Sequence, residues 1–502
     1  METGEKHKLE GESEAYDHVI KYTGLFGGIQ GMNLLASLVK NKLVAVILGP
    51  SGLGLISLYN TAITLLNNST NLGIPFSAVR HISELYEQDN HEELIHFIKV
   101  IRSWSLLTAL CGMLLCVLLS PCLSWAYFQD ISHWTAFLWL SPVVALMTVS
   151  GCELAVLKGT RQLKKVAIQS VIVSLGAILL CLPVYLIWGV SGIIASLLLI
   201  ALLTVSSMCY YSFRLYPFHY VLNSWTVLKS GCPMIRLGIA FTLGGIFTSG
   251  SEFLIRAFMM QLGSEADVGL YNAGYALTVT YASMVFTAME TDYFPRLSAV
   301  NQDVVKSNRT VNRQIEVSLI LIAPLLVGFL VFLPILLPLL YSSSFSSVVD
   351  MAKYAILGMF FRAITLPVAY LTLAKGRSKV FLFTESVYDI FAVVAIVTGY
   401  SIGGLSGTGM ALFLSALFDL LLVCLTCRIL YGYRIHRRVL MTMMVQMPLV
   451  ISAFLIVNVC EGTFYWSGGI ICILLSTILS VYLLSIRTTL LDKVRDWLKH
   501  EK

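Results

Sequence analysis

The sequence carries little charge for its length. Only 12% of its 502 residues are charged, whereas 57% are hydrophobic, and the mean hydropathy is +0.80. A soluble chain needs more polar surface than this to cover its core. Apolar runs of roughly 20 residues, the length that crosses a bilayer, recur along the chain. The composition therefore excludes a soluble enzyme and indicates a membrane protein.

Three further absences narrow the class. The 11 Cys lie mostly inside apolar runs, as small hydrophobic residues do, so neither a disulfide framework nor a metal site is expected. The first 19 residues are polar and lack the apolar core of a cleavable signal peptide, so the first span is expected to act as the insertion signal. No loop exceeds about 25 residues, and we expect no soluble catalytic domain and no cofactor.

The apolar runs predict an all-α polytopic protein of about 14 transmembrane helices. Several runs contain Gly and Pro, which membrane helices tolerate where neighbours satisfy the freed backbone groups. The predicted spans are 22–48, 53–79, 98–120, 135–157, 167–188, 190–212, 236–262, 268–293, 315–340, 354–374, 380–400, 407–430, 440–460 and 467–486.

Lys and Arg gather in every second loop, whereas the intervening loops carry almost none. Positive loops resist translocation and stay in the cytoplasm. The basic loops are those around Lys158, Lys306, Lys375 and Arg437. We therefore expect a multi-pass protein of the bacterial inner membrane with both termini in the cytoplasm.

An internal repeat relates the two halves of the chain. The segment KGTRQLKKVAIQSV from Lys158, with GVSG at 189–192, matches KGRSKVFLFTESV from Lys375, with GLSG at 404–407, at offsets of 217 and 215. The match rests on Gly, Lys and Arg at equivalent topological positions. Six spans separate the copies, so both halves have the same orientation and are expected to handle substrate between them.

The repeat predicts two pseudo-symmetric six-helix bundles and two additional C-terminal helices. The expected parts are a cytoplasmic N-terminal tail (1–19), an N-terminal bundle (20–215), a cytoplasmic linker (216–235), a C-terminal bundle (236–432), an extra helix pair (433–487) and a cytoplasmic C-terminal tail (488–502).

Three cations lie at span depth, where a charge costs on the order of 3 kcal/mol and suggests function. Lys42 and Arg256 occupy the same repeat position, six residues before Leu-Gly pairs, and Arg362 lies near the middle of its span. Arginine binds phosphate in a bidentate manner, so these side chains are candidates for an anionic ligand. The alternatives are snorkelling, a Glu252–Arg256 pair, and pairing of Arg362 with Asp389 or Asp419.

Carboxylates are missing from the first two spans, which disfavours a cation–drug exporter. Aromatic and amide side chains of the kind that bind sugars are present instead, although hydrogen bonds between helices explain them equally well. The candidate cavity residues are Lys42, Arg256, Arg362, Arg80, Arg296, Tyr59, Asn60, Asn67, Tyr271, Asn272 and Tyr275, with Glu252, Glu290 and Asp389 as candidates for ion coupling. Arg102 and Arg296 are expected to snorkel from the cytoplasmic ends of their spans.

The segment KLVAVILGPSGLGLISLYNTAITLL at 42–66, followed by RHISELYEQDNHEEL, resembles the start of bacterial polysaccharide flippases of the O-antigen (Wzx) type. These belong to a superfamily, MOP, that also holds multidrug exporters and the lipid II flippase. The resemblance covers residues 20–430, and its sharpest motif is LGPSGLG. It implies a V-shaped pair of bundles around a cavity lined by spans 1, 2, 7 and 8.

The resemblance also implies the cargo, an undecaprenyl-diphosphate-linked oligosaccharide moved from the cytoplasmic to the periplasmic leaflet. The cavity cations would meet the diphosphate, a proton or sodium gradient would drive transport, and a glycan polymerase and glycosyltransferases would be partners. The alternatives are a multidrug exporter of the same fold and a membrane glycan polymerase or ligase. The short outer loops disfavour the latter.

Overall fold

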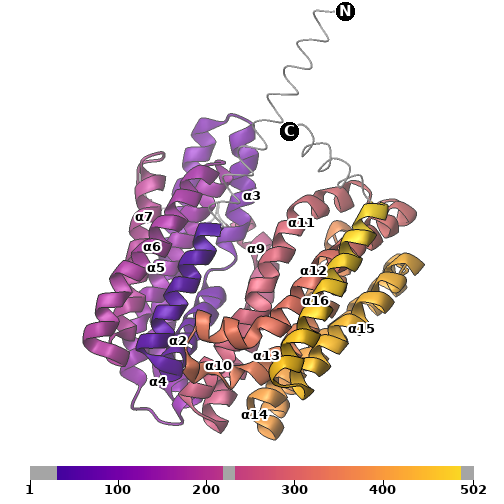
Figure 1. The fold of residues 1–502 in the computed structure, drawn as a ribbon. Helices are drawn as coiled ribbons and strands as arrows, with labels where there is room; N and C mark the ends of the chain where they lie inside the picture. The colour runs from indigo at the N-terminus through magenta and orange to yellow at the C-terminus, as the bar shows by residue number, and fades with distance from the viewer. Residues whose placement is uncertain (1–30, 219–231, 488–502) are drawn as a thin grey trace, which may run out of the picture. The chain divides into compact units, whose positions relative to one another are not determined.

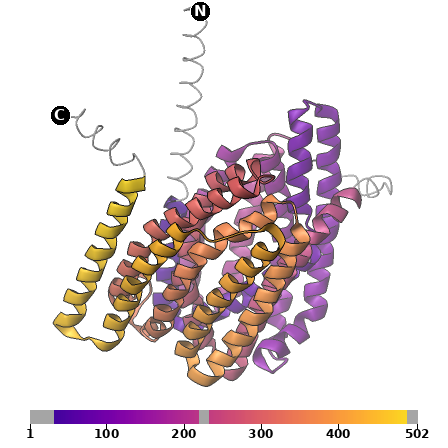
Figure 2. The same cartoon turned by 90° about the vertical axis from the view of Figure 1, so that its right-hand side faces the viewer.

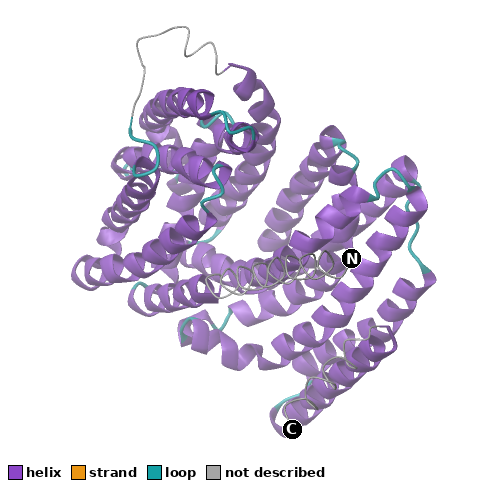
Figure 3. Cartoon of the chain, turned by 90° about the horizontal axis from the view of Figure 1, so that it is seen from above, coloured by secondary structure: helices purple, strands orange, loops and turns teal. Residues whose placement is uncertain are grey.

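The computed structural model describes residues 31–218 and 232–487, apart from some side chains at 232–241, 281–292 and 486–487. Every regular element in this part of the chain is a helix, and none is a strand (Figure 3). A helix is the natural state of these apolar segments, because a chain in lipid must satisfy its backbone groups internally. Two compact units, Met1–Ser249 and Gly250–Lys502, make up the chain.

The predicted all-α membrane fold is confirmed. Eight described helices are long and apolar enough to cross a membrane, and two of them, Leu163–Phe213 and Ser378–Tyr431, each cover two predicted spans. Most residues of the predicted ranges lie in helices where the chain is described.

In the first unit, α4 and α5 pack closely together and α5 also packs on α7. This unit shows in indigo to magenta in Figure 1. Its helices are a helix over residues 31–47, α2 (Gly49–Thr70), α3 (Ile74–Glu87), α4 (His91–Phe128), α5 (Trp134–Gly159), α6 (Leu163–Trp188), the short η1 (Gly189–Gly192) and α7 (Ile193–Phe213).

In the second unit, α13 and α14 form the most extensive helix contact, and α15 and α16 both pack on α12. Figure 2 shows the yellow α16 at an edge of this unit. Its helices are the end of α9 (Cys232–Leu262), α10 (Glu265–Tyr275), the π-helix η2 (Ala276–Thr280), α11 (Tyr281–Ala299), α12 (Val304–Leu340), the short η3 (Ser343–Phe345), α13 (Val348–Ala374), α14 (Ser378–Tyr431), α15 (Arg437–Val459) and α16 (Gly462–Arg487).

Two predicted spans are interrupted. The prediction of one continuous helix over 53–79 was wrong, because Leu72 and Gly73 adopt left-handed backbone angles (φ 51° and 66°) and separate α2 from α3. The predicted span 268–293 contains the π-helical turn Ala276–Thr280 between α10 and α11. Such turns occur often at functional sites, and this one directly follows Tyr275.

The repeat is visible in the backbone. Gly189 between α6 and α7 has φ 55° and ψ −132°, and Gly404 inside α14 has φ 55° and ψ −138°. The preceding loops contain left-handed residues at Arg161 and Gly376 (φ 57° and 69°). The offset between the two copies is 215 residues for both pairs. The backbone therefore gives a single offset, whereas the Lys-Gly pairs at Lys158 and Lys375 gave an offset of 217.

A buried amide joins the two additional helices. Gln446 on α15 donates to Ser480 Oγ (2.8 Å) and accepts from Ser476 Oγ (3.0 Å) on α16, and all three side chains are buried. We expect Gln446→Leu to destabilise this helix pair by about 1–2 kcal/mol, because both hydroxyls lose their partner. Denaturant unfolding in detergent measures the effect. Gln446→Glu keeps an acceptor for both serines, so at acidic pH it should lose less stability than Gln446→Leu.

Candidate functional site

The predicted cavity residues of the first unit divide into packed and open side chains. Tyr59 on α2 is buried and meets Phe137 edge-on, with ring centroids 5.6 Å apart. Asn67 accepts a hydrogen bond from Thr148 Oγ1 on α5 (3.0 Å). Asn60 is exposed, and Lys42, on the helix before α2, is partly exposed and makes a polar or electrostatic contact. Asn60 and Lys42 therefore retain surface that can meet a ligand.

Arg80 is a surface residue of this unit. It is exposed on α3 and donates from Nε to Glu84 Oε1 (2.9 Å), one helical turn away. This hydrogen bond lowers the pKa of Glu84. The pair is solvated, so it contributes little to stability.

The expectation that Arg102 snorkels was wrong. Its side chain is buried and forms a bidentate pair with Glu153, in which Nε meets Oε1 at 2.9 Å and Nη2 meets Oε2 at 3.0 Å. Nη2 also donates to Ser212 Oγ, and Nη1 donates to the carbonyls of Tyr216 (3.1 Å) and Pro217 (3.0 Å). The guanidinium thereby joins α4, α5 and α7 to the chain that follows α7, and snorkelling would break every one of these bonds.

In the second unit, Arg256 lies at the centre of predicted site residues. It is only 6% exposed, and its Nη1 meets Glu252 Oε2 (3.3 Å) and the Glu252 carbonyl (3.2 Å). Nη2 reaches Asn272 Oδ1 (3.5 Å), and the guanidinium lies 5.8 Å from the centre of the Tyr271 ring. Four of the predicted residues therefore meet here, and the expected Glu252–Arg256 pair forms.

Arg362 on α13 lies among acidic and phenolic side chains. Its Nε is buried without a hydrogen-bond partner, although the side chain as a whole is partly exposed. It interacts electrostatically with Tyr388, Tyr275, Asp419 and Glu385. Within the described residues, Arg362 forms no ion pair as short as 4.0 Å, so neither of the expected pairs, with Asp389 or Asp419, closes to contact distance.

The arginines and acids together form a polar cluster, which we call the α13–α14 cluster. Tyr275 links the two arginines, because it lies 5.8 Å from Tyr271 and interacts with both Arg256 and Arg362. Asp389 is 8% exposed and interacts electrostatically with Glu385 and Tyr388. The members of the cluster are Glu252, Arg256, Tyr271, Asn272, Tyr275, Arg362, Glu385, Tyr388, Asp389 and Asp419.

Four acids and two arginines give the α13–α14 cluster an excess of carboxylates. Such a site can exchange a small cation while its arginines bind anionic groups. Glu385 was not selected from the sequence, although it lies one helical turn before Asp389 on α14, and Asp419 was considered there only as a partner of Arg362. Among the described residues, no group of three His, Cys, Asp or Glu could hold a metal ion.

Two predicted residues of the second unit remain. Arg296, at the end of α11, is exposed and lines a separate cavity of about 490 Å³ with Arg309 and Arg313. Glu290 lies on α11, and its side chain is outside the described part of the structure.

Comparisons with known proteins give a consistent result. The model of the polysaccharide biosynthesis protein family matches residues 43–350. The lipid III flippase of Escherichia coli (strain K12) is 24% identical over 364 residues, which cover 70% of this chain and 84% of that protein, and the lipid III flippase of Shigella flexneri matches equally.

Solved structures with the same fold are membrane transporters. The lipid II flippase MurJ in an inward closed conformation has a TM-score of 0.67 at 13% identity, covering 92% of this chain and 98% of that one. An inward-facing multidrug resistance MATE transporter of the MOP superfamily also has a TM-score of 0.67, at 15% identity, covering 80% and 94%. Residues 1–432 are fewer than 92% of the chain, so the MurJ match extends into the residues after 432.

Proposed function

This chain belongs to the polysaccharide biosynthesis protein family, and from that premise we propose that it is a flippase for an undecaprenyl-diphosphate-linked oligosaccharide. It would move this lipid from the cytoplasmic to the periplasmic leaflet of the inner membrane by alternating access, as a transporter and not as an enzyme. The observation that carries the proposal is the similarity to a lipid III flippase over 84% of that protein's length. The cargo would be of the O-antigen, capsule or exopolysaccharide type.

The surroundings of Arg256 support this cargo. A guanidinium beside an amide and a tyrosine ring supplies the groups that bind a diphosphate and a neighbouring sugar. Glu252 holds the guanidinium from one side, so a diphosphate would have to compete with a single carboxylate whose side chain is 44% exposed. Lys42 would supply the corresponding charge from the first unit. We further propose that both termini face the cytoplasm, as the basic loops predict.

Energy for transport would come from a proton or sodium gradient acting on the carboxylates of the α13–α14 cluster. Asp389 is the best placed of the candidates because it is buried and interacts with Glu385, so binding of one cation would relieve repulsion between two acids. Cation binding at Asp389 would also affect Glu252, which is paired with Arg256. A glycan polymerase and glycosyltransferases would act before and after this step on the same lipid.

A leaflet assay tests the proposal. Purified protein is reconstituted in proteoliposomes with a fluorescent undecaprenyl-diphosphate-linked oligosaccharide, and a membrane-impermeant reagent reports which leaflet holds the sugar. We expect the natural protein to accelerate exchange, and Lys42→Ala with Arg256→Ala to slow it by at least about tenfold, because each lost charge-assisted bond is worth roughly 1.5–3 kcal/mol.

The matched control removes two cations outside the site. Lys40 lies on the same helix as Lys42, and Arg428 is an exposed residue in the last turn of α14. Lys40→Ala with Arg428→Ala should leave the rate unchanged. Equal rates for the two double variants would refute the site, and no exchange by the natural protein would refute the cargo.

A multidrug exporter is the second candidate, favoured by the MATE fold match. It predicts efflux of cationic drugs that depends on the carboxylates and tolerates loss of Lys42 and Arg256. The same variants therefore separate the two functions.

A further inference from the structure

A basic cavity of about 1080 Å³ opens at one end of the second unit, apart from the α13–α14 cluster. It lies where α12 and α15 begin and where α16 ends, so one bundle helix and both additional helices build it. Its polar lining comprises Arg309, Asn312, Arg313, Glu316, His436, Arg437 and Arg438, and its apolar lining comprises Val317, Ile320, Val439, Met441 and Leu484. We call it the α12–α15 pocket.

Two asparagines of α12 fix the geometry of this pocket. Asn308 donates to the Gly432 carbonyl (3.2 Å) and accepts from the Arg434 amide (3.4 Å). Asn312, which is buried, donates to the Arg434 carbonyl (2.9 Å) and accepts from the His436 amide (2.8 Å). The loop that leads into α15 is therefore held by its backbone against α12, and this contact places the residues after His436 beside α12.

The four arginines of the pocket have exposed side chains. Arg309 and Arg313 lie one turn apart on α12, and Arg437 and Arg438 form the first turn of α15. None of them forms an ion pair within 4.0 Å with another described residue, and Glu316 is the one acid in the lining. Solvent screens these charges in part, but four like charges around one cavity still attract an anion.

The start of α15 adds to this field. The residue that precedes it, His436, makes no side-chain hydrogen bond to the first turn. The N–H groups of this turn, which His436 does not cap, and the positive end of the helix dipole can therefore bind an anion. Because the arginines and the helix end act in the same cavity, a phosphate group fits its charge.

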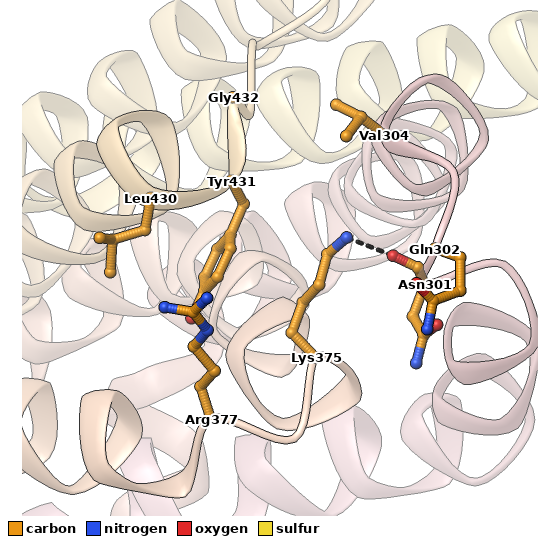
Figure 4. Close-up of a pocket in the computed structure, with 8 residues that line it drawn as sticks. All are labelled: Asn301, Gln302, Val304, Lys375, Arg377, Leu430, Tyr431 and Gly432. Atoms are coloured by element: carbon orange, nitrogen blue, oxygen red, sulfur yellow. Dashed lines mark hydrogen bonds between the residues drawn. The ribbon is translucent and has the colours of Figure 1, made fainter.

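The end of the unit that carries this pocket is basic more widely. A second cavity, of about 510 Å³, is lined by Lys375 and Arg377 (Figure 4). Lys375 there donates to the backbone carbonyl of Asn301, and Arg377 lies beside Tyr431. Because these cations already have neighbours within the protein, the α12–α15 pocket is the better candidate for a bound anion.

We propose that the α12–α15 pocket binds the phosphate headgroup of an anionic phospholipid in the cytoplasmic leaflet. The arginines and the α15 N-terminus hold the phosphate, and Val317, Ile320, Met441 and Leu484 contact the start of the acyl chains. Basic pockets between membrane helices bind such headgroups on the cytoplasmic side. All lining residues belong to one unit, so the lipid can stay bound as a structural ligand. The site depends on the proposed orientation but not on the proposed cargo.

Thermal unfolding of the full chain in detergent, with phosphatidylglycerol added, tests this assignment. We expect the lipid to raise the melting temperature by a few degrees through mass action. Arg313→Gln with Arg438→Gln should weaken the apparent affinity by an order of magnitude or more, since each basic residue contributes to headgroup binding. Arg313→Lys with Arg438→Lys should retain most of the effect.

The matched control removes two exposed cations outside the pocket. Arg434 lies in the same loop as His436, and Lys164 lies in the first unit. Arg434→Gln with Lys164→Gln should respond to phosphatidylglycerol like the natural protein. An unchanged lipid response of the Arg313/Arg438 glutamine variant would overturn the site.

Three further ligands separate the sources of phosphate. Phosphatidylcholine and inorganic phosphate should produce little stabilisation. An equal response to inorganic phosphate would overturn the lipid assignment, and stronger binding of undecaprenyl diphosphate than of phosphatidylglycerol would assign the pocket to the cargo. Transport is not measured here, so failure of this proposal is distinct from failure of the flippase proposal.

Discussion

Replacing Glu153 with alanine should destabilise the first unit by about 3–5 kcal/mol, because it leaves Arg102 buried without its counter-ion. Arg102 is about as buried as Glu153 (2% and 3% of the side chains exposed), so water cannot substitute for the lost carboxylate. Ser212 and the two backbone carbonyls would remain, but they carry no full charge. The free energy of unfolding, measured by denaturant titration in detergent, reports the loss.

Two comparisons make this prediction specific. Arg80→Ala, at the exposed Arg80–Glu84 pair, should change stability by no more than about 0.5 kcal/mol. Arg102→Met with Glu153→Met should recover most of the stability lost by Glu153→Ala, since replacing a whole buried pair by apolar groups is often neutral. A Glu153→Ala protein as stable as the Arg80→Ala protein would contradict the structure.

Replacing Arg362 with alanine should destabilise the second unit by about 3 kcal/mol and slow lipid exchange. The guanidinium is the cation that interacts with Glu385 and Asp419. Without it, the acids of the α13–α14 cluster repel one another in a medium of low dielectric constant. Denaturant unfolding and the leaflet assay are measured on the same preparation.

A double-mutant cycle tests the cause. Asp419→Asn removes one acid, so Arg362→Ala with Asp419→Asn should be more stable than Arg362→Ala alone. Arg362→Lys keeps the charge, so it should lose less than half of the stability that Arg362→Ala loses. If the lysine and alanine variants behaved alike, the positive charge would not be what the cluster requires.

The spans were predictable because a run of about 20 apolar residues is a local property of the sequence, and its length matches the hydrocarbon core of a bilayer. The break at Leu72 and Gly73 was not predicted, although Pro75 follows it, because Gly and Pro occur in unbroken membrane helices as well. The Glu252–Arg256 pair was also predictable, since residues four apart on a helix face one another.

The Arg102–Glu153 pair could not be read from the sequence in the same way. The two residues are 51 positions apart on different helices, and only the packing of α4 on α5 brings them together. The position of Arg102 near a span end suggested an exit to water, which α7 and the chain after it block. Arg362 was identified as a cation at span depth, but its surroundings depend on how α13 packs against both parts of α14.

Gly189 and Gly404, in the two repeated turns, have a backbone conformation that limits how far these turns can diverge in sequence. The conformation of Gly189 and Gly404, near φ 55° and ψ −135°, is the mirror image of polyproline backbone and would suit a D-amino acid. A Cβ added at either position would touch nothing within 4 Å. Chirality alone, and not neighbouring atoms, therefore excludes other residues there. Such a constraint persists however far the surrounding helices drift, which explains why GVSG and GLSG are among the clearest surviving traces of the duplication.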